Sequence, residues 1–170
     1  MRIFVWAPIA AALLAQAPQL YQGKEEKLPL AVAPQPVLFS HRQHAKARLK
    51  CADCHPGAAK AERAGLPDAA RCLVCHRTIQ ASNAEVRKLA EYQAKGGRIP
   101  WVRVYRVPEF VFFSHASHVG AAIECETCHG PVATRDVLEK EVSTSMTSCM
   151  NCHAAREVSN DCHFCHALGF

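Results

Sequence analysis

Phe-Ser-His-Ala-Ser-His occupies residues 113–118, and Cys-Glu-Thr-Cys-His follows at residues 125–129. The same arrangement occurs earlier in the chain, where Phe-Ser-His-Arg-Gln-His at 39–44 precedes Cys-Ala-Asp-Cys-His at 51–55. In both copies the first histidine lies ten residues before the first cysteine of the motif that follows. A repeat with fixed spacing indicates that the chain contains two related structural units.

All ten cysteines belong to Cys-x-x-Cys-His motifs, of which there are five. The cysteines are Cys51, Cys54, Cys72, Cys75, Cys125, Cys128, Cys149, Cys152, Cys162 and Cys165. The histidines that complete the motifs are His55, His76, His129, His153 and His166. This motif is the attachment signature of c-type haem, because two thiols add to the vinyl groups at one porphyrin edge and the histidine ligates the iron from the proximal side. The sequence therefore predicts five haem c groups.

Zinc and disulfides are the alternative uses of so many cysteines. Zinc ribbons combine Cys-x-x-Cys units in pairs to make tetrahedral sites, and five units cannot all be paired. Neither zinc nor a disulfide scaffold requires a histidine after every second cysteine. Covalent haem explains both features.

Five further histidines are candidates for the distal side of the irons: His41, His44, His115, His118 and His163. Histidines at i and i+3 lie on one side of a helical turn, so each His-x-x-His pair can reach two different irons. His163 lies inside its own Cys-x-x-Cys loop and cannot fold back over that haem. The fifth distal ligand is therefore Met146, since methionine is a haem ligand that raises the potential, or His163 reaching a neighbouring haem.

The N-terminus predicts export from the cytoplasm. Arg2 precedes an apolar stretch over 3–14, and Ala15-Gln16-Ala17 has the small-x-small form of a cleavage site. We interpret residues 1–17 as a signal peptide or short anchor, although Pro18 is unfavourable directly after a cleavage site, and residues 18–34 as a linker. The expected location is the periplasm, with membrane association through a complex or an uncleaved N-terminus as the alternative.

The Phe-Ser-His-x-x-His segments, their offset and the motif spacing resemble the class III multihaem cytochromes c, the cytochrome c3 superfamily. The resemblance implies a dihaem c3-like unit with a connecting helix over 35–100 and a trihaem c3-like unit over 101–170. It also implies which distal residue shares an iron with which proximal histidine. The implied pairs are His41 with His55, His44 with His76, His115 with His129, His118 with His153, and Met146 with His166.

Four stretches resemble more specifically the pentahaem cytochrome subunit of alternative complex III and related quinol-oxidising complexes. These are residues 35–41, 64–67, 99–108 and 125–132. The resemblance implies quinol-oxidising membrane subunits and iron–sulfur or molybdoenzyme-like subunits as partners. A free periplasmic shuttle is the alternative.

Outside the motifs we expect a small, haem-cored fold that is mostly irregular, with short α-helices and a short β-strand pair. Ser82-x-x-Glu85 has the form of a capping box for a helix that Gly96-Gly97 ends. Weak alternation predicts a short strand over 101–107, and we expect Trp101 to pack against a haem face.

Positive and negative residues are distributed unevenly between the two halves of the chain. Residues 41–107 hold 14 Lys and Arg against 5 Asp and Glu, whereas residues 108–170 hold 3 against 8. Haem propionates would add about two negative charges per haem, so this asymmetry can orient docking to redox partners. No nucleic-acid motif accompanies the basic half, and we expect no nucleic-acid partner.

We expect an electron carrier rather than an enzyme, because an iron with both axial positions filled cannot bind substrate. The expected path enters at the dihaem half and leaves at the Cys162–Cys165 site. A multihaem reductase with one open haem is the alternative enzyme, and high-spin iron would reveal it.

Overall fold

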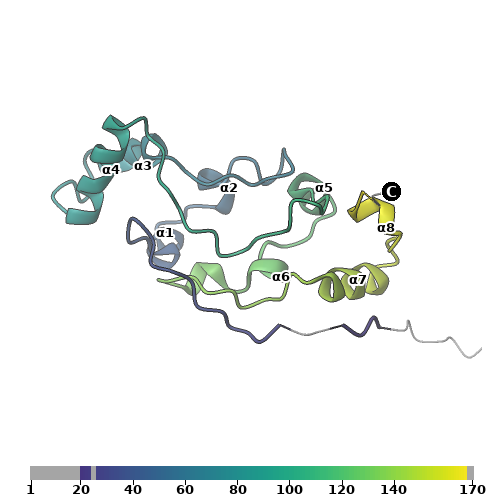
Figure 1. Cartoon of the computed structure of the whole chain (residues 1–170). Coiled ribbons are helices and arrows are strands. Elements are labelled where there is room, and N and C mark those ends of the chain that lie inside the picture. Colours follow the sequence, from purple (N-terminus) through teal and green to yellow (C-terminus); the bar gives the residue numbers. More distant parts are fainter. Residues whose placement is uncertain (1–19, 24–25, 168–170) are drawn as a thin grey trace, which may run out of the picture.

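The computed structural model describes residues 20–23 and 26–167, so the predicted signal peptide or anchor over 1–17 lies outside the described residues. The described part is a series of short helices joined by irregular segments (Figure 1). The helices are α1 (His41–Lys46), α2 (Cys51–Cys54), α3 (Ala69–His76), α4 (Ala84–Ala94), α5 (His115–Gly120), α6 (Glu126–His129), the 3₁₀ helix η1 (Val132–Thr134), α7 (Met146–Ala155) and α8 (Cys162–Cys165). None of these helices has the length and apolar character needed to cross a bilayer.

The two sequence repeats fold in the same way. Ser40 caps α1 by accepting a hydrogen bond from the amide of Gln43 at 3.1 Å, and Ser114 caps α5 by accepting one from Ser117 at 3.2 Å. Serine is a favoured N-cap because its hydroxyl satisfies an amide that the helix cannot. Each His-x-x-His pair thus sits at the start of a helix whose position is fixed by the preceding serine.

A small hydrophobic core lies where α3 packs against α4. Its buried members are Val37, Ala69, Leu73, Leu89 and Ile99. Trp101 packs against this cluster and donates its indole N–H to the carbonyl of Pro67 at 2.8 Å. These five are the only buried hydrophobic side chains in the described part of the chain, so side chains alone provide little interior.

The helix expected from Ser82 is present as α4, with a different cap. Its N-cap is Asn83, whose side-chain oxygen accepts from the amide of Glu85 at 2.8 Å. The carboxylate of Glu85 is engaged elsewhere, with the amide of Leu38 at 2.9 Å and the ammonium of Lys88 at 2.7 Å. The predicted capping box is therefore wrong by one residue. Gly96 and Gly97 do end the helix, with positive φ values of 95° and 80°.

The predicted β-strand pair is wrong for the described residues, which form isolated bridges only, Leu30 with Lys140 and Val111 with His166. The segment 101–107 is irregular. Its backbone is hydrogen-bonded to a side chain instead of to a neighbouring strand. The side-chain amide of Gln35 accepts a hydrogen bond from the N–H of Val102 and donates one to the carbonyl of Val102, both at 3.0 Å. One glutamine thus replaces the partner that a strand would need.

The segment that precedes α1 follows the surface of the C-terminal half. The backbone of Tyr21 forms two hydrogen bonds with the side chain of Asn151, at 2.7 and 3.3 Å. Lys140 pairs with the carboxylate of Glu26 at 2.6 Å, and its backbone bridges to Leu30. We call residues 20–23 and 26–34 the N-terminal strap.

Candidate haem sites

Three pairs of histidine rings face each other at nearly the same distance. The ring centroids are 6.3 Å apart for His115 and His129, and 6.2 Å apart for His118 and His153. The third pair, which joins the end of α1 to the end of α3, has its centroids 6.0 Å apart. Its members are His44 and His76. In each pair one ring comes from a His-x-x-His helix and the other from a Cys-x-x-Cys-His motif.

This distance is the one expected for two imidazoles that share a metal. A ligating nitrogen lies about 2.0 Å from its metal and about 1.1 Å from the centre of its own ring, so two opposed rings have centroids about 6.2 Å apart. The three pairs therefore fit the axial ligands of haem iron, in the combinations that the resemblance implies.

The fourth expected pair is His41 with His55. Burial, followed by the nearby rings of His55 and His44, lowers the pKa of His41 to about 4. A low pKa keeps the ring neutral, the form that binds iron. Its Nδ1 is buried and has no hydrogen-bond partner within the described part of the chain, so His41 is positioned by its helix rather than by a bond to its ring.

Five other axial candidates are held through Nδ1. His44 and His118 each donate to the carbonyl of their N-cap serine at 2.8 Å, and His115 donates to the carbonyl of Glu62 at 2.8 Å. His55 and His76 likewise face the carbonyls of Gly65 and Ile79, at 2.7 and 3.0 Å. Because a carbonyl can only accept, each Nδ1 carries the proton and Nε2 keeps its lone pair for a metal.

Two phenylalanines fix the orientation of these rings. Phe39 stacks on His44 with centroids 4.3 Å apart and meets the ring of His41 edge-on at 4.8 Å. Phe113 does the same in the second unit, at 4.6 Å from His118 and 4.8 Å from His115. The phenylalanine of the repeated motif is therefore a platform for both histidines.

At the fifth site, no other histidine ring of the described residues lies about 6.2 Å from the ring of His166. The ring of Phe110 lies 5.9 Å from that of His166, and its carbonyl is 3.4 Å from Nδ1. His163 faces Asp161, with Nδ1 3.1 Å from the carboxylate, and is 70% exposed. Met146 is the first residue of α7 and lies one turn before Cys149.

The thiols of different motifs are neighbours in space. Burial is the largest cause of a raised pKa at five of these thiols, and a cysteine of another motif adds to each shift. The neighbours are Cys72 with Cys54, Cys125 with Cys51, Cys128 with Cys152, and Cys149 with Cys128 and Cys165. The five motifs therefore form one row, and Figure 1 shows the helices that carry them in the same order from left to right: α3, α2, α6, α7 and α8.

The centre of the row joins the two sequence repeats. The loop after His55 meets α5, since the carbonyls of Ala61 and Glu62 accept hydrogen bonds from the amides of Ala116 and His115 at 3.0 and 3.1 Å. On the other side, Arg42 forms an ion pair with Asp136. In the row, the motif that ends at His55 is therefore the direct neighbour of the motif that ends at His129, although the motif at Cys72 lies between them in the sequence.

Tyr105 is a residue near the sites that the motifs did not reveal. Its ring meets His129 edge-on at 4.6 Å, and its hydroxyl donates to the His129 carbonyl at 3.2 Å. The same hydroxyl accepts from the amides of Glu141 and Val142, at 3.1 and 3.3 Å. A half-buried tyrosine hydroxyl usually finds such partners, but nothing in its local sequence indicates which histidine it would support.

Comparisons with known proteins agree with this geometry. Residues 17–96 match the family model for the Class III cytochrome C family, and residues 111–167 match that for cytochrome c7 and related cytochrome c. The chain is also 31% identical over 160 residues to the "Menaquinone reductase, multiheme cytochrome c subunit" of Nitratidesulfovibrio vulgaris (strain Hildenborough), covering 78% of this chain and 76% of the relative. The chain belongs to the class III multihaem cytochrome c family. As a cytochrome c of this family it binds haem c covalently and is an electron carrier.

Proposed function

We propose that this class III cytochrome carries five haem c groups in a single row and passes electrons along it as a subunit of a periplasmic, quinone-linked respiratory complex. The observation that carries the proposal is the row itself, in which each motif lies beside the next. Bound haem iron takes up and releases one electron by changing its oxidation state. The similarity to a menaquinone reductase subunit supports the link to quinone chemistry.

In this proposal each motif holds its haem by both cysteines and by the histidine that follows. His41, His44, His115 and His118 supply the distal nitrogen at the sites of His55, His76, His129 and His153. The three pairs near 6.2 Å support this assignment, and the neighbouring positions of His41 and His55 extend it to the fourth. Four sites with both axial positions filled leave no room for substrate, which favours electron transfer over a multihaem reductase.

At the fifth site we propose Met146 as the distal ligand in preference to His163. Met146 and Cys149 are three residues apart on α7 and so share a face of the helix. Cys149 is a neighbour of Cys165, which belongs to the fifth motif. His163 instead interacts with Asp161 and is largely exposed to solvent.

The number of haems is tested by intact mass and redox titration of the purified holoprotein. The mass under denaturing conditions should exceed that of the mature polypeptide by five haems, and complete reduction should require five electron equivalents. A smaller count of either kind would contradict the five-site row.

Replacing Met146 with histidine should lower the potential of one haem and leave the other four unchanged. Axial ligand identity shifts haem potentials within a range of about 0.8 V across proteins, and methionine gives higher values than histidine. The measurement is a spectroscopic redox titration of Met146→His beside wild type. The control is Met150→His, which lies inside a motif loop and should change none of the five potentials.

Two outcomes would decide against Met146. If all five potentials stay the same in Met146→His, then Met146 is not a ligand. If oxidised wild-type protein shows high-spin iron or binds carbon monoxide without denaturation, one haem is five-coordinate and the reductase alternative replaces the carrier.

Membership of a complex is tested by the state in which the cytochrome is extracted. A subunit should purify from membranes with other redox subunits and elute from gel filtration at their combined size. A free shuttle would remain in the soluble periplasmic fraction and elute at the size of one chain.

A further inference from the structure

We propose that the outer side of α4 is the docking surface for an acidic redox protein that exchanges electrons with the Cys72–Cys75 site. The inference rests on the proposed function and adds to it the place of contact and the charge of the partner. We define the α4 basic face by Arg87, Lys88, Lys95 and Arg98.

The α4 basic face lies at one end of the row of sites. α4 packs directly on α3 through Leu89 and Leu73 in the hydrophobic core. α3 carries both cysteines of the Cys72–Cys75 site, which has a neighbouring motif on one side only. Helices in contact have axes about 8–10 Å apart, so a protein bound on α4 is one helix layer from the terminal site.

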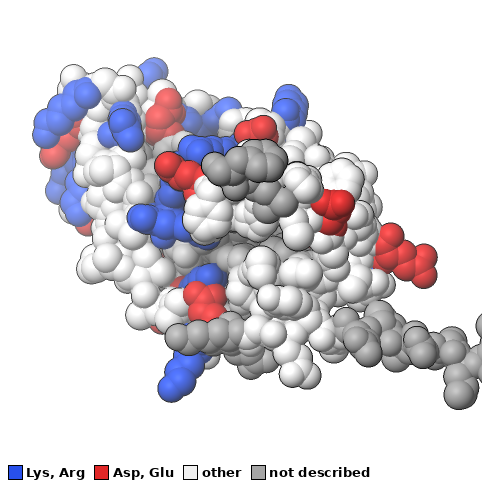
Figure 2. Space-filling view, turned by 45° about the vertical axis from the view of Figure 1, so that its right-hand side comes forward, with Lys and Arg blue, Asp and Glu red and all other residues white. Residues whose placement is uncertain are grey.

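Positive charge is concentrated at this end. Residues 69–98 hold six Lys and Arg against two Glu. One of the two, Glu85, already binds the ammonium of Lys88 and the amide of Leu38. Figure 2 shows basic side chains gathered over the left-hand end of the molecule, where α3 and α4 lie, while the visible right-hand side carries acidic groups. The two ends of the row therefore attract partners of opposite charge.

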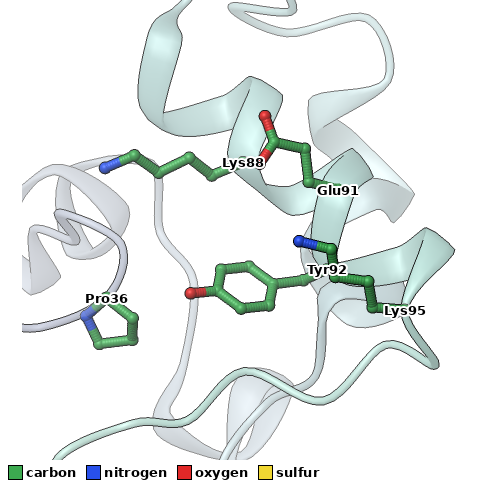
Figure 3. A pocket seen from close by; sticks show the side chains of 5 residues that line it. All are labelled: Pro36, Lys88, Glu91, Tyr92 and Lys95. Carbon is green, nitrogen blue, oxygen red and sulfur yellow. The ribbon is translucent and has the colours of Figure 1, made fainter.

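The surface also offers a place for a partner's side chain. A pocket of about 260 Å³ lies between Pro36 and α4, lined by Lys88, Glu91, Tyr92 and Lys95. Figure 3 shows the Tyr92 ring extending toward Pro36, with the ammonium of Lys95 beside the ring. An apolar floor with a charged rim is the usual composition of a protein interface. Val74, between the two cysteines of the terminal site, is 76% exposed at the same end.

A partner with a cluster of carboxylates fits these features. Opposite charges on two surfaces raise the association rate by steering the encounter, and salt screens the effect. Weak, charge-guided contact also suits a carrier, because the partner must leave after each transfer.

The test is stopped-flow reduction of the full holoprotein by an acidic flavodoxin, itself reduced beforehand to the hydroquinone, at several ionic strengths. For wild type we expect the second-order rate constant to fall steeply as salt rises. Arg87→Glu combined with Lys95→Glu should lower the rate at low salt by about tenfold, because reversed charge removes the steering. The matched control, Arg106→Glu with Arg156→Glu, changes net charge equally at two exposed positions outside the α4 basic face and should lie within about twofold of wild type.

Other results would overturn the docking surface. Equal losses in the two double variants would mean that net charge alone matters, and a wild-type flavodoxin rate that does not fall as salt rises would exclude a charge-guided contact. Reduction by dithionite distinguishes this failure from failure of the proposed function. If dithionite reduces the protein but the α4 substitutions do not change the flavodoxin rate, only the docking surface is wrong. If dithionite does not reduce the protein with five equivalents, the proposed function is wrong as well. Circular dichroism of both double variants establishes that they fold.

Discussion

Removal of the Cys51–Cys54 attachment site should separate the terminal site at α3 from the three sites of the C-terminal half. In Cys51→Ala with Cys54→Ala, the denatured protein should be lighter than wild type by one haem beyond the loss of two sulfur atoms. A ruthenium photosensitiser attached through Lys95→Cys can deliver electrons at the α4 end. In wild type, repeated flashes should reduce all five sites rapidly. In the variant, one site of the remaining four should be reduced rapidly and three only slowly.

The reason is the order of the row, in which the motif at Cys51 has Cys72 on one side and Cys125 on the other. Cys162→Ala with Cys165→Ala is the matched control, because it removes a terminal site and leaves four sites in continuous contact. All four should still be reduced rapidly. Rapid reduction of the three distant sites in the Cys51 variant would show that the row has another order.

Synthesis of the chain without haem attachment should yield a polypeptide with no cooperative folded state. Each buried aliphatic side chain contributes about 1.5–3 kcal/mol, whereas ordering the backbone costs about 1–2 kcal/mol for every residue. Only five hydrophobic side chains are buried in the described part of the chain. The porphyrins must therefore provide most of the interior, and they are absent when the chain is made in the cytoplasm without attachment machinery.

The measurement is far-ultraviolet circular dichroism with limited proteolysis, on haem-free chain and on holoprotein under the same conditions. Holoprotein should melt in a transition and resist protease. Haem-free chain should show neither behaviour, and a cooperative melt in that sample would contradict a haem-built interior.

The sequence was most informative where chemistry fixes spacing. The i, i+3 spacing of the His-x-x-His pairs predicted that each lies on a helical turn, and both do lie on helices, α1 and α5, which Ser40 and Ser114 cap. Both copies of the motif also have the same ring stacking, with Phe39 and Phe113 as platforms. These features depend on contacts within six residues, which a local motif can encode.

Features that depend on long-range contacts could not be predicted. The row places the motif at Cys51 next to that at Cys125, and no local pattern carries this information. The expected strand over 101–107 failed because the side chain of Gln35 satisfies the backbone of Val102 from 67 residues away. The cap of α4 was misplaced by one residue because Ser82 and Asn83 are both good caps, and the engagement of Glu85 with Leu38 was not visible in the sequence.

The N-terminal strap has a consequence for how the protein matures. Glu26 and Lys140 are 114 residues apart, and their contact closes a loop that includes the first three motifs. The entropy cost of closing a long flexible loop falls once the intervening chain is already ordered. The strap should therefore dock late, after the haems of those three motifs have been joined to the chain.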